Sequence, residues 1–236
     1  PYRFEQLYQS GIRDYCFVVG REKRSIEDHF TPHETYVNEL SDSNKILMSN
    51  FYKKLEKSNL MWINQNRPMG FGDAVKRAER FVANDDFIVH AGDVAIISKS
   101  NEHPVLRLMH TAKSDPTISA IILCKKVKDT KRYGVPKIKK ISSSHYIVEE
   151  VEEKPDKPKS DFGILPIYFF KPKIFQSLKR IRAGKNKEFQ LTDAIQDLIG
   201  MKEKVVAIPL RTNEVEIDVG TVDTYKQALD DSYKYA

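Results

Sequence analysis

The segment Thr117–Lys126, TISAIILCKK, is the most apolar stretch of the chain. Apolar and β-branched side chains fill most of its positions, so we expect a strand that is covered on both faces. Similar runs alternate along the chain with segments of helical periodicity. This alternation is typical of α/β proteins, and it predicts a mixed, mostly parallel sheet flanked by helices.

The remaining elements follow from the same two periodicities. The predicted helices are residues 3–11, 21–30, 44–57, 73–82, 104–113, 173–181 and 189–199, with a last helix after Thr221. The predicted strands are residues 15–20, 60–64, 86–93, 117–126, 132–138, 145–153, 161–170, 204–210 and 215–220. Among these, 132–138, 145–153 and 161–170 have the pattern of successive antiparallel strands.

The length and continuity of the chain predict a single domain over residues 1–236. The 236 residues are enough to bury a full core, and we find no internal repeat and no linker between separate cores. The chain opens in a helix, whereas a doubly wound sheet usually opens with a strand whose following turn binds the ligand. We therefore expect that an N-terminal strand and a phosphate-binding loop are missing from this sequence.

Charge and cysteine content narrow the classes of partner and the compartment. The net charge of +6 is spread along the chain without the interleaved aromatic residues of a nucleic-acid surface, and it suits small phosphorylated anions. Cys16 and Cys124 lie inside apolar runs, which indicates free thiols in a reducing compartment. No apolar run reaches the length of a membrane span. We expect a cytoplasmic protein that contacts neither nucleic acid nor membrane.

Two aspartates follow predicted strands, Asp93 in HAGDVAI and Asp218 in VEIDVGT. Ligands of open α/β sheets bind beyond the carboxyl ends of strands, and two carboxylates there could jointly hold Mg²⁺. The alternative is that each aspartate stabilises its own turn, with Thr221 capping the last helix. The sequence leaves both interpretations open.

Two further segments also have a structural and a functional interpretation. In QNRPMGFGDAV, the Gln65 amide could pair with a nucleobase edge beside Gly70 and Gly72, although a simple strand–helix turn explains the glycines too. Residues 151–163, VEEKPDKPKSDFG, have the composition of a proline-broken linker. Whether they form part of an anion site depends on the rest of the chain.

The order of the motifs resembles that of the sugar-1-phosphate nucleotidylyltransferases, and among them the bacterial and archaeal UTP–glucose-1-phosphate uridylyltransferases. The resemblance covers nearly the whole chain and rests on QNRPMGFGDAV, AGDV, RYGVPKI, EEKP, EFQLTDAI and EIDVGTVDTYKQAL, together with residues 8–30. It implies a Rossmann-like nucleotidyltransferase domain and a requirement for Mg²⁺. The implied reaction forms UDP-glucose and pyrophosphate from UTP and glucose 1-phosphate.

The resemblance also implies a role for each matching residue. The base would contact Gln65 and Gly70, and the metal would be held by Asp93 and Asp218. The sugar phosphate would be bound by the remaining three residues, namely Gly134 through its backbone, Glu153 through the sugar hydroxyls, and Lys154 through the phosphate. Lys154 and Asp93 would be the catalytic pair, and the EEKP motif would belong to the site.

Several departures from the family pattern leave alternatives open. The glycine-rich G-x-G-T-R loop and the lysine that follows it are absent, and Asp73, Val94 and Asp161 replace residues that are common in relatives. Transfer of a thymidylyl group, a non-catalytic regulatory relative, and a metal-dependent glycosyltransferase are the alternatives. We expect a homo-oligomer whose ligands are UTP or dTTP and glucose 1-phosphate.

Overall fold

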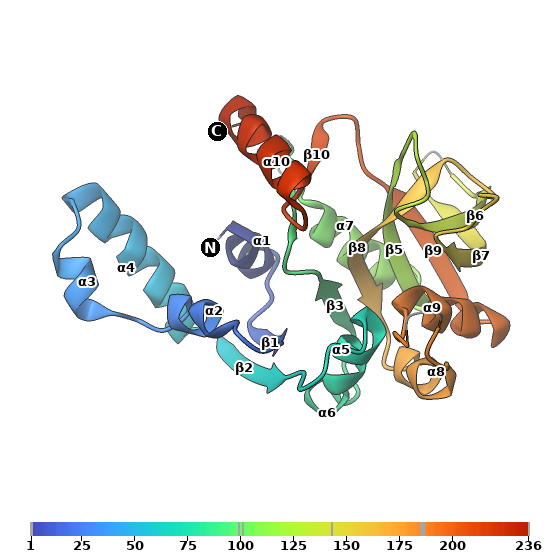
Figure 1. The fold of residues 1–236 in the computed structure, drawn as a ribbon, viewed down its shortest axis with the longest axis horizontal. Helices are drawn as coiled ribbons and strands as arrows, with labels where there is room; N and C mark the ends of the chain where they lie inside the picture. Colours follow the sequence, from blue (N-terminus) through green and yellow to red (C-terminus); the bar gives the residue numbers. More distant parts are fainter. Residues whose placement is uncertain (1, 99, 101, 143, 185–186, 236) are drawn as a thin grey trace. The chain divides into compact units, whose positions relative to one another are not determined.

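The computed structural model describes residues 2–98, 100, 102–142, 144–184 and 187–235. The chain divides into two compact units, Pro1–Pro68 and Met69–Ala236, which are described separately below (Figure 1). The expectation of a single domain over residues 1–236 stays a prediction.

Unit 1 is a short parallel strand pair with helices around it. Its elements are α1 (Tyr2–Gln9), β1 (Asp14–Val19), α2 (Arg24–His29), α3 (Glu34–Asn38), α4 (Asp42–Glu56) and β2 (Asn59–Asn64). The chain leaves α1 through Gly11, whose φ of +88° favours glycine, as the sequence predicts for this helix end. Phe4, Tyr15, Phe51 and Leu55 form its buried core, in which aromatic rings predominate.

Unit 2 contains the long apolar strands. It begins with α5 (Phe71–Arg77), α6 (Glu79–Val82), β3 (Phe87–His90), β4 (Val94–Ser98), α7 (Pro104–Ser114), β5 (Ile118–Lys126), β6 (Gly134–Lys140) and β7 (Tyr146–Glu153). It continues with β8 (Phe162–Phe170), α8 (Ile174–Arg180), α9 (Leu191–Gly200), β9 (Lys204–Pro209), β10 (Glu214–Asp218) and α10 (Val222–Tyr235).

Six strands of unit 2 form one mixed sheet in the order β3-β8-β5-β9-β7-β6, and β10 pairs with β4 in a separate antiparallel ribbon (Figure 1). β5 and β9 are parallel, while β8 and β7 run against their neighbours. Four of the six strands therefore share one direction, which confirms the predicted mixed α/β fold. Because the two opposed strands are interleaved, most neighbouring pairs are nevertheless antiparallel.

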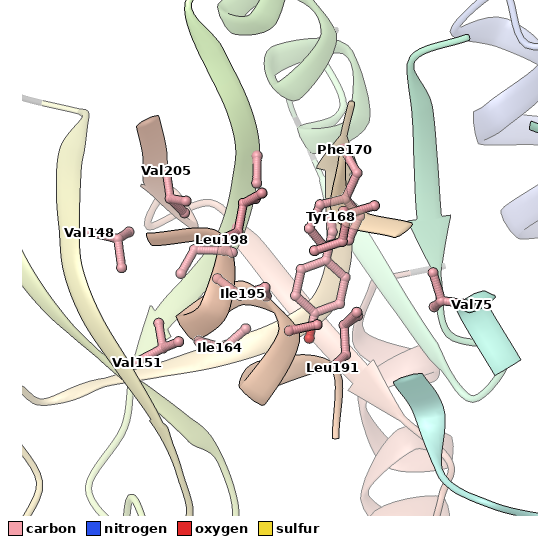
Figure 2. Close-up of a cluster of buried hydrophobic side chains, with 14 of the residues drawn as sticks. Val75, Val148, Val151, Ile164, Tyr168, Phe170, Leu191, Ile195, Leu198 and Val205 are labelled. Atoms are coloured by element: carbon pink, nitrogen blue, oxygen red, sulfur yellow. The ribbon is translucent and has the colours of Figure 1, made fainter. Parts of the chain in front are cut away.

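Strand β5 is buried on both faces, as its sequence predicts. Ala120, Ile122 and Cys124 belong to a core cluster that includes residues of α8 and α9 (Figure 2). Side chains alternate across a strand, so Ile121 and Leu123 face the other side, and both are fully buried. Helix α7 packs against β5 and β8. The sheet is therefore flanked by helices.

The structure corrects three details of the sequence interpretation. β8 does not follow β7 in the sheet but lies between β3 and β5. The physical reason is polarity, because β8 is apolar along nearly its whole length, whereas β6 and β7 each contain exposed residues; β6 forms the edge of the sheet and β7 lies next to it. Residues 73–82 form two helices divided at Ala78, and the strand β4 was not predicted.

Among the described residues, no helix is both long and apolar enough to cross a membrane.

Candidate active site

The ribbon of β4 and β10 brings the two predicted metal ligands together. Asp218 is the last residue of β10 and lies opposite Val94, which directly follows Asp93. The Val219 amide donates to the Asp93 carbonyl at 2.9 Å, so the backbone pairing extends past the end of the strand. Antiparallel pairing thus places two aspartates that are far apart in the sequence beside each other.

Gly220 shows how closely the two carboxylates approach. A Cβ atom built on Gly220 would lie 3.0 Å from Asp218 Oδ1 and 3.2 Å from Asp93 Oδ2. The two oxygens therefore lie close to the same point, the position that the Cβ of any residue other than glycine would occupy. Carboxylate oxygens in such a position suit a hard divalent cation. Within the described part of the chain no group of three or more His, Cys, Asp or Glu side chains could hold a metal, so water and phosphate oxygens would complete the coordination.

These residues also form the turn and the helix cap that the alternative interpretation of the sequence predicts. Asp218 Oδ1 accepts a hydrogen bond from the Gly220 amide at 2.7 Å, and Thr221 Oγ1 accepts one from the Thr224 amide at 3.2 Å near the start of α10. The first bond fixes the direction of the Asp218 carboxylate and uses one lone-pair site of Oδ1, so the carboxylate can still bind a cation through its remaining lone pairs. Turn formation and metal binding are therefore compatible.

A second cluster lies at the end of β7, where the sequence predicts the sugar site. Gly134 is paired with Glu153, and a Cβ built on Gly134 would lie 3.2 Å from Glu153 Oε2 and 3.1 Å from Thr192 Oγ1. The Thr192 hydroxyl donates to Glu153 Oε2 at 2.7 Å. Gly134 is buried, and the absence of a side chain there lets Glu153 and Thr192 of the neighbouring helix pack directly against its backbone.

Burial raises the proton affinity of groups around Glu153. The pKa of Asp193 is raised above its usual range, mainly by burial and next by the negative charge of Glu153. The same two causes raise the pKa of Tyr168, which lies beside Leu191 at the start of α9 (Figure 2). The Glu153 carboxylate thus lies among poorly solvated groups, where nearby cations and hydroxyl donors are stabilised.

Lys154 directly follows β7 and has a left-handed backbone conformation with φ of +45°. Its amide donates to the Tyr133 carbonyl at 3.1 Å, and its Nζ lies 3.7 Å from Glu153 Oε1. The side chain is 57% exposed, whereas that of Glu153 is 24% exposed. The ammonium group of Lys154 is therefore the more exposed partner, and the Glu153 carboxylate is the more buried one.

The rest of the EEKP loop behaves as a tethered segment beyond the site. Lys159 forms an ion pair with Glu150, and the Ser160 hydroxyl donates to the Pro136 carbonyl at 2.6 Å. Both contacts return the chain to the β6–β7 hairpin. The charged, proline-containing residues thus form a loop attached at its two ends, with Glu153 and Lys154 at the first end.

Comparison with known proteins identifies the family. The sequence model described as nucleotidyl transferase matches residues 2–234. This chain belongs to the nucleotidyl transferase family. Members of this family generally use a divalent metal.

Individual relatives support the assignment. The chain is 35% identical over 211 residues to UTP–glucose-1-phosphate uridylyltransferase 2 of Streptococcus pyogenes serotype M3, covering 86% of this chain and 69% of that protein. A second relative from Streptococcus pyogenes, with the name UTP–glucose-1-phosphate uridylyltransferase, is 32% identical over 219 residues. The match covers 90% of this chain and 71% of that protein.

Solved structures agree in fold. An apo UDP-glucose pyrophosphorylase matches with a TM-score of 0.89 and 24% identity, covering 99% of this chain and 85% of that chain. A UDP-glucose pyrophosphorylase complexed with UDP-glucose matches with a TM-score of 0.85 and 25% identity, covering 100% of this chain and 86% of that chain.

The glycines of this nucleotidyl transferase that were predicted to contact the base also serve packing. A Cβ on Gly70 or Gly72 would lie 2.8 or 2.7 Å from the Phe189 carbonyl oxygen, and the Gly72 amide donates to that oxygen. Gln65 belongs to unit 1, where its amide donates to the Val19 carbonyl at 2.8 Å. The assignment of Gln65 and Gly70 to the base stays a prediction.

Three residues depart from the family pattern, and each has a local structural role. Asp73 accepts a hydrogen bond from Arg77 one turn later in α5. Asp161 pairs with Lys126 at 3.1 Å. Val94 is buried next to Asp93. Asp73 and Asp161 thus make local contacts away from the two clusters, whereas Val94 lies within the first of them, opposite Asp218.

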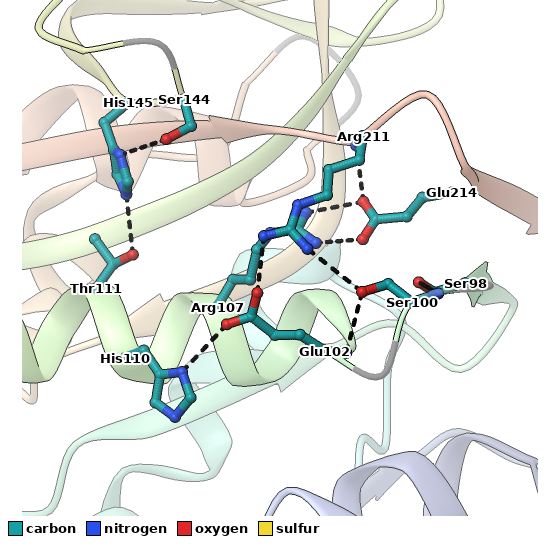
Figure 3. Close-up of polar contacts among 10 residues, drawn as sticks. All are labelled: Ser98, Ser100, Glu102, Arg107, His110, Thr111, Ser144, His145, Arg211 and Glu214. Atoms are coloured by element: carbon teal, nitrogen blue, oxygen red, sulfur yellow. Dashed lines mark hydrogen bonds and ion pairs between the residues drawn. The ribbon is translucent and has the colours of Figure 1, made fainter.

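Strand β10 is anchored by a buried polar network at the end away from Asp218 (Figure 3). Arg107 of α7 makes a bidentate pair with Glu214, whose side chain is fully buried, and the Arg211 amide donates to Glu214 Oε2 at 2.8 Å. Arg107 and Arg211 also line a cavity of about 450 Å³ beside His145. The ion pair thus attaches the strand of this nucleotidyl transferase that carries Asp218 to a core helix.

Sequence reasoning missed the α9 side of the site. Thr192 lies in EFQLTDAI, a motif that the resemblance includes but to which it assigns no residue. The available signal was a threonine and an aspartate at the start of a helix, which is also an ordinary pattern for helix capping. Only the contact with Glu153 distinguishes the two interpretations.

Proposed function

We propose that this protein transfers a uridylyl group from UTP to glucose 1-phosphate, producing UDP-glucose and pyrophosphate. The observation that carries the proposal is the convergence of Asp93 and Asp218 on the space beside Gly220. The family match and the names of the relatives indicate which reaction such a site serves. The cluster of Gly134, Glu153 and Lys154 adds a suitable place for a sugar phosphate.

The reaction requires positioning more than proton transfer. An oxygen of the sugar phosphate, which is largely dianionic at neutral pH, attacks the α-phosphorus of UTP. The bond from that phosphorus to the bridging oxygen breaks, and pyrophosphate leaves with the electron pair. No general base is needed, so the barrier comes from repulsion between two anions and from alignment.

Asp93 and Asp218 are the residues that would hold Mg²⁺. When bound, this ion would screen phosphate charge and stabilise the charge on the departing pyrophosphate. The two carboxylates fit it because their oxygens lie close to the same point and the chain offers no softer ligand there among the described residues.

Glu153 and Lys154 divide the recognition of the sugar phosphate. One carboxylate oxygen of Glu153 is held by Thr192, which orients the other for the sugar hydroxyls. Lys154, the more exposed of the two, would pair with the phosphate and reduce its repulsion from the triphosphate. Gly134, which is buried against Glu153 and Thr192, would contact the sugar through its backbone.

A reducing compartment fits this proposal. Cys16 and Cys124 are both free, and burial raises the pKa of their thiols to about 11 and about 12. Such thiols are largely protonated and unreactive near neutral pH. We propose the cytoplasm, where UTP and sugar phosphates are available to the enzyme.

The test is release of pyrophosphate by the full-length protein from UTP or dTTP with glucose 1-phosphate, as a function of Mg²⁺. We expect UTP to be preferred, and Asp93→Asn to lower turnover by about two orders of magnitude or more, since loss of a metal ligand removes several kcal/mol of charge stabilisation. Asp86→Asn, which changes an exposed carboxylate just before β3, is the matched control and should be nearly neutral.

Two results would count against the proposal in different ways. Absence of pyrophosphate release with either nucleotide would reject the reaction. Normal turnover of Asp93→Asn at low Mg²⁺ would retain the reaction and remove Asp93 from the metal site.

A further inference from the structure

Among the described residues, the last part of β7 has β6 as its one strand partner. β7 pairs with β6 through Glu153, but it pairs with β9 only at Tyr146 and Ile147. The register with β6 shifts, since Lys137 pairs with Glu150 and Ile138 with Val148. This irregularity separates the part of β7 that β9 fixes from the part that carries Glu153. The second part must therefore be positioned by something other than β9.

Helix α9 occupies the free edge of this strand segment. Gln196 Oε1 accepts a hydrogen bond from the Val151 amide at 2.8 Å, and Thr192 Oγ1 donates to Glu153 Oε2 at 2.7 Å. A side-chain amide thus takes the place of a neighbouring strand. Without it the Val151 N–H would lose this partner, which is unfavourable for a buried donor.

The spacing of the two contacts explains why a helix can replace a strand here. Thr192 and Gln196 are separated by four helical residues, a rise of about 6 Å. Val151 and Glu153 are separated by two strand residues, a rise of about 6.6 Å. The two pairs therefore match, with α9 and β7 running in opposite directions. Together they hold the strand at two points next to the sugar site.

We infer that Gln196 is a positioning residue for recognition of the sugar phosphate. It acts through the backbone of Val151, which sets the direction of Glu153 and Lys154 two and three residues later. This inference rests on the proposed function, because Glu153 and Lys154 are its sugar-phosphate ligands. Gln196 has no role in attaching the metal ligands, so its effect falls on one substrate only.

A purely structural role for Gln196 makes a different prediction. Helix α9 is already held in the core by Ile195 and Leu198, both fully buried. If Gln196 only added to this packing, its loss would lower stability and affect both substrates alike. A selective effect on glucose 1-phosphate, with a local change at Val151, separates the two roles.

The experiment compares two variants of α9. Gln196→Met keeps the length of the side chain and removes the hydrogen-bond acceptor. Ile195→Val lowers the stability of the protein through the same helix and changes no polar contact with β7. We expect Gln196→Met to raise the KM for glucose 1-phosphate about three- to tenfold, because one hydrogen bond is lost. The KM for UTP should stay within about twofold of the parental value. Ile195→Val should lower the melting temperature and leave both KM values near those of the parent.

Hydrogen exchange of the full-length protein provides a readout that needs no activity. Exchange in residues 147–154 should become about three- to tenfold faster in Gln196→Met and remain unchanged in residues 162–170 of β8. Gln196→Glu retains an oxygen acceptor of the same length and should restore the protection.

The possible results are distinct. A parent that releases no pyrophosphate rejects the proposed function, while the exchange data still decide whether α9 holds this strand. Equal changes in both KM values, or unchanged exchange in residues 147–154, overturn the positioning role of Gln196.

Discussion

Lys154 combines an exposed ammonium group with a left-handed backbone that is uncommon for a residue with a side chain. We expect Lys154→Met to lower kcat/KM for glucose 1-phosphate about tenfold or more, because a charge-assisted bond to phosphate contributes roughly 1.5–3 kcal/mol. The methionine keeps the apolar stem, so the melting temperature should change little. The measurement is steady-state kinetics with each substrate varied in turn.

Lys157 provides the control, since it is an exposed lysine of the same loop. Lys157→Met should leave kcat/KM near that of the parent. If both variants behave alike, the loop acts through its overall charge and Lys154 has no specific contact with the phosphate.

His103 caps helix α7 with an unprotonated nitrogen. Its Nδ1 accepts a hydrogen bond from the Val105 amide at 3.2 Å, and burial, followed by the charge of His90, lowers the pKa of His103 to about 4. Because this lies below the ordinary value near 6.5, the stabilisation is complete above pH ~6.5 and is lost as the pH falls toward 4. We expect the free energy of unfolding to decrease by up to about 3 kcal/mol over this range.

Urea unfolding at pH 7 and pH 4.5 tests this expectation. His103→Asn retains a capping side chain that does not titrate, so its stability should depend less on pH than that of the parent. His110→Asn changes an exposed histidine of the same helix and should keep the parental pH dependence. Equal pH dependence in all three proteins would show that His103 is not the titrating group.

At the scale of elements, β10 depends on a single buried ion pair for its attachment to α7. Arg107 is 8% exposed and Glu214 is fully buried, so removal of one partner leaves an unpaired charge in the core. We expect Arg107→Met to lower the free energy of unfolding by about 3–5 kcal/mol. The Mg²⁺ concentration needed for half-maximal turnover should rise too, since β10 carries Asp218.

Two further variants make the ion-pair prediction decisive. Arg107→Met combined with Glu214→Leu removes both charges and should recover much of the lost stability. Arg211→Met breaks exposed contacts with Glu102 and Ser100 and should cost less than about 1 kcal/mol. If the double variant is no more stable than Arg107→Met, the buried charge is not the source of the loss.

The elements show where sequence patterns are sufficient and where they fail. β5 and α4 could be predicted because a long apolar run and a helical repeat are local signals. β4 has five residues and is stabilised by pairing with β10, which lies more than a hundred residues later, so no local pattern reveals it. The order of strands in the sheet likewise depends on contacts between distant segments, as the position of β8 between β3 and β5 shows.

At the scale of the whole molecule, the site could be predicted only in part for the same reason. Asp93 and Asp218 were recognisable because each follows a strand, and the structure places them beside one space. Thr192 and Gln196 were not, because their importance comes from helix α9 lying along β7. A sequence indicates which residues can carry chemistry, whereas the residues that orient them emerge from packing.

The interleaved sheet also has a consequence for synthesis on the ribosome. β8 must insert between β3 and β5. Phe87 therefore cannot pair with Phe170, nor Ile121 with Phe169, until β8 has been synthesised. At about 5–20 residues per second, the nascent chain exposes the apolar edge of β5 for roughly several seconds, and the β5–β9 pairing must wait longer still. Unpaired apolar edges favour aggregation. The interval between emergence of β5 and emergence of β8 is therefore the period in which this chain most needs a chaperone.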